Sequence, residues 1–130
     1  MKVFISSTWV DLQRHRRAVI ATIEKLRHQG FDVQWLGMEA FGAADQSPSD
    51  TCQGFVDQAD LFLGILGVRY GPIDPRTNMS MTEAEYRRAC ERHIPRLMFL
   101  IDEDNARVRP AQVEKSPVAL AKLEKLKSDA

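Results

Sequence analysis

The segment Leu61–Leu66 limits most strongly how this chain can fold, because it contains no polar residue. Such a run is typical of a parallel strand that is buried on both faces of a sheet. A second apolar run, Leu97–Ile101, predicts another buried strand, and residues 2–6 form a short β-prone run at the start of the chain. Residues 31–35 alternate apolar and polar side chains, which indicates a strand with one polar face. The pattern therefore predicts four strands.

Segments with the apolar spacing of helices separate these strands. One covers residues 9–28 and follows Thr8, which has the spacing of a capping box with Asp11. Others begin near residues 47, 82 and 116. Strands that alternate with helices run parallel, and right-handed crossovers place the helices on both faces of the sheet.

The alternation of elements predicts one α/β domain over residues 1–130. Its sheet is expected to be open, doubly wound and parallel, with four strands in the flavodoxin-like order 2-1-3-4. A fifth strand would normally complete such a sheet, and the sequence shows none. We therefore expect the chain to be a domain cut from a longer protein.

The charges of the chain balance, with 18 Lys and Arg residues against 18 Asp and Glu residues. Nucleic-acid-binding domains are usually basic, so no nucleic-acid partner is expected. No apolar run approaches the roughly 20 residues of a membrane helix, and the N-terminus lacks the pattern of a signal peptide. The two cysteines lie far apart in the sequence and are interpreted as reduced thiols. These features predict a cytoplasmic protein that binds no membrane.

No pattern predicts a metal or a cofactor. The three histidines lack metal-ligand spacing with cysteines or carboxylates. The glycines at 64, 67 and 71 are not followed by the Lys-Ser/Thr of a phosphate loop, and a dinucleotide fingerprint would follow the first strand instead. The basic segment Arg14–Arg17 is interpreted as a solvated helix face, since acidic residues elsewhere balance it.

A ligand site is predicted at the carboxyl ends of the strands, where the strand order reverses. Hydroxyl groups, backbone N–H groups and a helix N-terminus meet there and suit a phosphate or carboxylate. An alternative stays open: Thr8 caps the following helix, which its spacing to Asp11 favours, and Gly67 only permits a turn. The ligand-binding residues predicted from these two segments are Ser6, Ser7, Thr8, Gly67, Arg69 and Tyr70.

The segment Ser80–Tyr86 opens a helix whose N-terminus is expected to face the same crevice. Glu83 and Glu85 are two positions apart, so at most one of them points into the site. Both also have capping-box spacing, to Ser80 and Thr82 respectively, and spacing alone favours the capping interpretation. Glu39, in the loop after the second predicted strand, either faces the crevice or caps a turn.

Five segments of the chain, in order, resemble one family: residues 2–8, 37–43, 59–62, 67–71 and 80–86. The family is the domain of unknown function 4062, which is similar to TIR domains. Its members commonly stand at the N-terminus of large proteins with NACHT- or STAND-type NTPase and repeat domains. The resemblance implies a TIR-like fold and an effector or signalling role of the kind found in defence proteins. It also implies that this chain is the N-terminal part of a longer multidomain protein.

Catalytic TIR domains cleave NAD at the nicotinamide–ribose bond with a glutamate early in the helix after the third strand, and Glu85 matches that position. Met81 and Thr82 stand where many TIR domains carry Trp and Cys. The resemblance implies that Glu85 stabilises the positive charge that develops on the ribose. Further residues expected at the ligand are the pyrophosphate donors Ser6, Ser7 and Arg69, the ring contacts Trp9, Phe41 and Tyr70, and the carboxylates Glu39 and Glu83.

Two functions are predicted in parallel. The first is an effector that binds, and hydrolyses, NAD or a related nucleotide, with NAD as a substrate and not a cofactor. The alternative is a non-catalytic module that associates with copies of itself or with other domains of a parent protein. A weaker third prediction is a nucleobase or nucleoside transferase.

Overall fold

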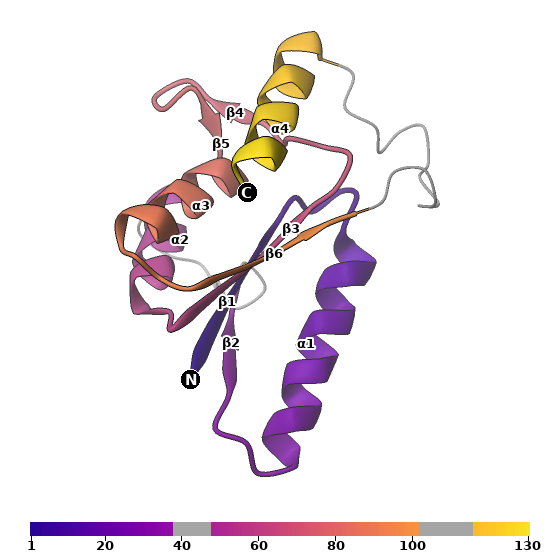
Figure 1. Cartoon of the computed structure of the whole chain (residues 1–130), viewed down its shortest axis with the longest axis vertical. Helices are drawn as coiled ribbons and strands as arrows, with labels where there is room; N and C mark the ends of the chain where they lie inside the picture. Colours follow the sequence, from indigo (N-terminus) through magenta and orange to yellow (C-terminus); the bar gives the residue numbers. More distant parts are fainter. Residues whose placement is uncertain (38–47, 102–115) are drawn as a thin grey trace.

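A computed structural model describes residues 1–37, 48–101 and 116–130 of the chain (Figure 1). The helices and strands, in chain order, are β1 (Lys2–Ser7), α1 (Gln13–His28), β2 (Gln34–Leu36), α2 (Pro48–Gln58), β3 (Leu61–Leu66), β4 (Ile73–Asp74), β5 (Met79–Ser80), α3 (Met81–Glu91), β6 (Arg96–Leu100) and α4 (Pro117–Asp129). Four strands form one parallel sheet in the order β2-β1-β3-β6. The predicted α/β class and strand order are confirmed.

The sheet carries helices on both faces (Figure 1). Helix α1 lies on one face, and α2, α3 and α4 lie on the other. Right-handed crossovers require this arrangement of α1, α2 and α3, which connect parallel strands. The core under α1 is built from Val3, Ile5, Ile23 and Val33. The larger core on the opposite face includes Phe4, Val56, Phe62, Tyr86, Leu123 and Leu126.

The register between β1 and β3 decides which side chains reach the site. The two strands pair from Val3 opposite Leu61 to Ser7 opposite Ile65. Side chains alternate along a strand, so Ser6 faces the helices α2 and α3 whereas Ser7 faces α1. The two neighbouring hydroxyl groups therefore belong to opposite faces of the sheet.

Strand β6 is an edge strand, and the prediction that residues 97–101 are buried on both faces is wrong. Among the described residues, only β3 pairs with it. Leu97 and Phe99 lie on the α1 side of the sheet and are 49% and 52% exposed. An apolar run indicates a strand, but it does not report whether a neighbouring strand or helix covers that strand.

Helix α1 begins at Gln13, later than its predicted start after Thr8. Thr8 Oγ1 does donate a hydrogen bond to Asp11 Oδ1, but the pair stabilises the loop between β1 and α1 and does not cap the helix. The N-cap position belongs to Leu12, which makes no side-chain cap hydrogen bond. The capping interpretation of Thr8 is therefore wrong, because the helix begins five residues after Thr8.

A short antiparallel hairpin, β4 and β5, lies between β3 and α3, where apolar spacing predicts only a loop. Its turn closes on Asn78, which has a positive φ of 58° and donates its N–H to Asp74 O at 2.8 Å. Lys122 of α4 donates to Asn78 O at 2.9 Å and so links the hairpin to that helix. Within the described residues, no helix has the length and apolar content to cross a membrane.

Candidate functional site

Ser6 and Ser7 end β1 and contact different partners across the sheet. Ser6 Oγ donates a hydrogen bond of 2.7 Å to Glu85 Oε1 on α3, and both groups are buried. Ser7 Oγ donates to Thr8 O at 2.9 Å and accepts from Arg16 Nη1 at 3.0 Å. Only Ser6 thus shares a face of the sheet with the predicted catalytic glutamate.

Glu85 does not cap its own helix. The N-cap of α3 is Ser80, whose Oγ accepts from Glu83 N at 3.2 Å. Glu85 is 6% exposed and extends toward the carboxyl end of β1. Ser80 therefore caps α3 through its hydroxyl, but the Glu83 half of the predicted capping box is not formed, because Ser80 N donates to Tyr70 Oη instead. Glu85 lies where strand order reverses between β1 and β3.

Tyr70 and Glu83 attach the bend after β3 to the start of α3. Tyr70 Oη donates to Glu83 Oε1 at 2.6 Å and accepts from Ser80 N at 3.0 Å. Glu83 Oε2 also accepts from Arg87 Nε at 3.2 Å. Burial, followed by the hydrogen bond to Glu83, raises the pKa of Tyr70 above its ordinary value. The Tyr70 ring is 1% exposed and belongs to the core, so it gives a ligand almost no surface.

Gly67 brings the bend after β3 into contact with the loop after β1. A Cβ atom at this position would lie 2.6 Å from Asp11 Oδ2 and 3.0 Å from Leu12 Cδ2, so a larger residue would force the Asp11 side chain to shift from its present position. Asp11 Oδ2 accepts hydrogen bonds from Val68 N at 3.0 Å and Arg69 N at 3.2 Å. The bend thus binds a carboxylate, as its chemistry predicts, but the carboxylate belongs to the chain itself.

Arg16 is the residue of this region that the sequence pattern misses. It is 1% exposed, although Arg14–Arg17 predicts a solvated face, and that prediction is wrong for Arg16. Its Nη2 donates to Ile5 O at 3.3 Å, in addition to the Nη1 bond with Ser7. Its spacing from Leu12 and Ile23 places it on the apolar stripe of α1, and that spacing is the signal that could have identified it.

The remaining predicted site residues differ in where they lie. Trp9 is 42% exposed in the loop that follows β1, and Arg69 is half-buried in the bend after β3. Glu39 and Phe41 lie outside the described residues. Across those described residues, no group of three or more His, Cys, Asp or Glu side chains is arranged to hold a metal ion.

The sheet order, and the position of α3 over the end of β1, define a TIR-like α/β fold. The chain belongs to the family described as "Domain of unknown function (DUF4062)", whose model matches residues 2–130. The resemblance carried by the five sequence segments is thereby confirmed.

Solved structures with the same fold have low sequence identity to this chain. A prokaryotic SEFIR domain is 17% identical and overlaps with a TM-score of 0.55, covering 98% of this chain and 94% of its own. A conserved protein from Enterococcus faecalis V583 is 12% identical with a TM-score of 0.56, covering 100% and 99% of the two chains. A CMP N-glycosidase from Clostridium botulinum, BcmB, is 19% identical, covers 100% of each chain and reaches a TM-score of 0.49, too low to support an argument. The first two similarities show the fold alone, so the chemistry has to be inferred from the residues of the site.

Proposed function

We propose that this domain binds NAD or a related nucleotide and hydrolyses it at the nicotinamide–ribose bond, with Glu85 as the catalytic carboxylate. The observation that carries the proposal is the position of Glu85. It is a buried glutamate that does not cap its own helix and is held by Ser6 Oγ at the carboxyl end of a central strand. Ligands of open α/β sheets bind at this edge, where the strand order reverses.

The proposed reaction breaks the bond between the ribose C1′ and the ring nitrogen of nicotinamide. The bonding electrons leave with the ring, which becomes neutral nicotinamide, and a water oxygen bonds to C1′ and loses one proton. Positive charge develops on the ribose during this step, and a carboxylate beside it stabilises that charge. In the proposal, Glu85 supplies this carboxylate and receives the proton of water, while Ser6 fixes its orientation.

Fewer groups are available for the pyrophosphate than the sequence predicts. The N–H groups of Val68 and Arg69 bind Asp11, and the hydroxyl of Ser7 contacts Arg16 on the other face of the sheet. We assign the pyrophosphate contact to the Arg69 side chain and to the exposed loop that carries Thr8 and Trp9. Glu83 supports α3 through Tyr70 and Arg87 in this proposal and does not contact the ligand.

The test incubates the protein with NAD at high protein concentration, with and without a crowding agent, and measures the release of nicotinamide by chromatography. Glu85→Gln keeps the size of the side chain and removes its charge, so it is expected to abolish release. Glu91→Gln, at the exposed end of the same helix, is the matched control and should act like the parent protein. Hydrolysis that survives Glu85→Gln, or is absent from the parent protein under all conditions, contradicts the proposal.

The second candidate is a non-catalytic module that assembles with copies of itself or with other domains of a signalling protein. A specific observation favours it: β6 lies at the edge of the described sheet, with Leu97, Phe99 and Leu100 about half exposed. Exposed apolar edge strands are common sites of strand-to-strand association. Concentration-dependent oligomers without release of nicotinamide would favour this candidate over hydrolysis.

A further inference from the structure

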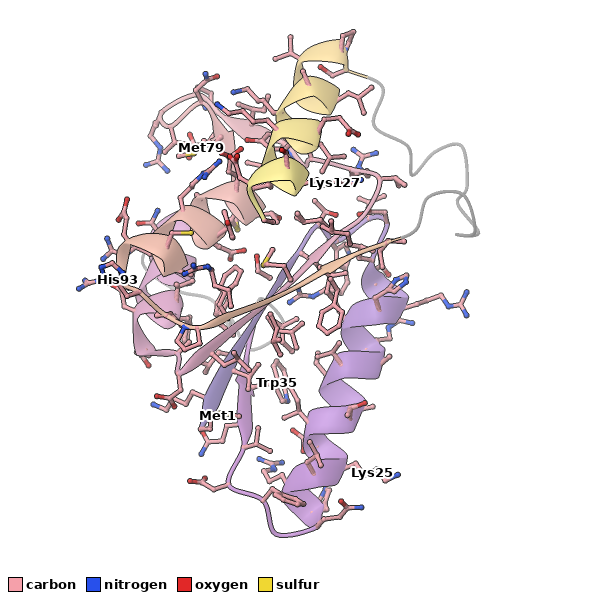
Figure 2. The ribbon with its side chains drawn as sticks, viewed as in Figure 1. Met1, Lys25, Trp35, Met79, His93 and Lys127 are labelled. Carbon is pink, nitrogen blue, oxygen red and sulfur yellow. The ribbon has the colours of Figure 1, made fainter. Side chains whose placement is uncertain are left out.

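A small cavity of about 200 Å³ lies between the β4–β5 hairpin and the first turn of α3. Its walls are mostly apolar and include Pro72, Ile73, Met79, Met81 and Ala84. Figure 2 shows Met79 on the hairpin beside the start of α3. All of its lining residues are described, and the sequence assigns none of these five to a ligand.

The cavity lies about one helical turn from Glu85 along α3. Met81 and Glu85 are four residues apart on α3, so they lie on one face of the helix and about 6 Å apart along its axis. Ser80, another lining residue, lies close to Gly71, where a Cβ atom would be 3.7 Å from Ser80 Cβ and 3.3 Å from Thr8 Cγ2. Gly71 thus lies between Ser80 of the cavity lining and Thr8, which directly follows β1.

The lining selects a flat and weakly polar group. Two methionines face the cavity, and their thioether sulfurs make favourable contacts with aromatic rings. The carboxylate of Asp74, the charged residue of the lining, is bound by Arg76, with Asp74 Oδ1 accepting from Arg76 N at 2.9 Å and Oδ2 accepting from Nη2 at 3.1 Å. This ion pair neutralises the charge of Asp74, and the lining contains no cationic side chain, so the cavity has the chemistry of a site for a heterocyclic ring and not for a phosphate.

We infer that this cavity receives the nicotinamide ring of the nucleotide whose glycosidic bond lies beside Glu85, an inference that rests on the proposed function. The ring would enter between the hairpin and α3, and the ribose would lie between the cavity and Glu85. Met79, Met81 and Ala84 are then the residues that recognise the ring, in place of the buried Tyr70.

The test follows the methyl signals of the methionines by NMR in protein labelled at those methyl groups. The chain has five methionines, and Met1, which is exposed before the amino end of β1, serves as an internal control. Nicotinamide alone is expected to shift the signals of Met79 and Met81, because the ring lies against them, and to leave Met1 unchanged. ADP-ribose, which lacks the ring, is expected to shift neither. Absence of nicotinamide shifts at Met79 and Met81, or equal shifts with ADP-ribose, overturns the inference.

A pair of variants gives the same test a quantitative form. Ala84→Leu fills the cavity and is expected to weaken nicotinamide binding by roughly tenfold, whereas Ala21→Leu on the exposed face of α1 should leave it unchanged. If Ala84→Leu does not fold, the NMR titration of the parent protein with nicotinamide still tests the inference. Ring binding at Met79 and Met81 without hydrolysis of NAD contradicts the proposed function and keeps the cavity assignment. Hydrolysis without such binding contradicts only the assignment.

Discussion

Ser6 and Glu85, 79 positions apart in the sequence, are joined by a hydrogen bond of 2.7 Å from Ser6 Oγ to Glu85 Oε1. Strand β1 brings Ser6 to the carboxyl edge of the sheet, and the crossover from β3 brings α3 over the same edge. The bond connects the first strand of the chain to its third helix. The same contact therefore bears on both the stability of the fold and the orientation of the proposed catalytic group.

Ser6→Ala is expected to lower the free energy of unfolding by about 1–3 kcal/mol, because it leaves a buried carboxyl oxygen without this donor. It is also expected to slow release of nicotinamide by up to roughly 100-fold, since Glu85 loses its orientation. Urea unfolding and the NAD assay measure the two effects. Ser128→Ala on the exposed end of α4 is the control and should change neither. A Ser6→Ala protein as stable as the parent would contradict the expected contribution of this hydrogen bond to the free energy of unfolding.

The four strands of the parallel sheet could be predicted from sequence because each carries a local pattern, an apolar run or an apolar–polar alternation, whereas the two-residue strands of the β4–β5 hairpin are too short to show one. Side-chain partners at the site could not be predicted, because they depend on register and on contacts between distant segments. The sequence places the hydroxyl groups of Ser6 and Ser7 at one predicted site, yet the alternation of side chains along β1 directs them to opposite faces of the sheet. Asp11 has the spacing of a helix cap, yet it binds a bend more than fifty residues away.

Gly67→Ala is expected to destabilise the protein by about 1–3 kcal/mol, since the added Cβ would lie 2.6 Å from Asp11 Oδ2 and force the two loops apart. Their separation should weaken the bonds from Val68 N and Arg69 N to Asp11. Urea unfolding measures the stability, and hydrogen exchange of these two amides measures the loosening of the bend.

Gly54→Ala is the matched control for this substitution. Gly54 lies within α2, and a Cβ atom there would meet nothing within 4 Å. Alanine in a helix is more favourable than glycine by about 1 kcal/mol, so this variant should be more stable than the parent protein. Equal destabilisation at both positions would show that close approach is not the reason glycine stands at position 67.

The stability of the pairing between α2 and α3 is expected to depend on pH through Asp57. Hydrogen bonds from Arg88 first, and then from Arg92, hold the pKa of Asp57 below its ordinary value. A carboxyl whose pKa is lowered in the folded protein contributes stability above its unfolded pKa, about 3.9, and loses that contribution as pH falls through the folded pKa. Asp57→Asn should therefore be less stable than the parent protein near neutral pH, and the difference should shrink below about pH 4.

Urea unfolding at a series of pH values measures this difference. The same comparison in an Arg88→Gln background provides the control, because Arg88 makes the largest contribution to the shift. In the Arg88→Gln background, the change in stability caused by Asp57→Asn should depend less on pH. A difference that stays constant between about pH 7 and pH 3 would show that Asp57 acts through packing and not through its charge.

Phe99→Lys is expected to weaken any self-association of this domain, because the substitution places a charge on the exposed side of β6. Phe99 is half exposed on a strand whose outer edge has no partner strand among the described residues. Lysine on an edge strand opposes pairing with a second chain, since the association would have to remove its charge from water.

Phe31→Lys is the control, because Phe31 is also exposed but lies between α1 and β2, away from this edge. Sedimentation velocity over a range of concentrations should show smaller assemblies for Phe99→Lys than for the parent protein and for Phe31→Lys. Equal loss of assembly in both variants would place the interface elsewhere, and equal assembly in all three proteins would exclude β6 from it.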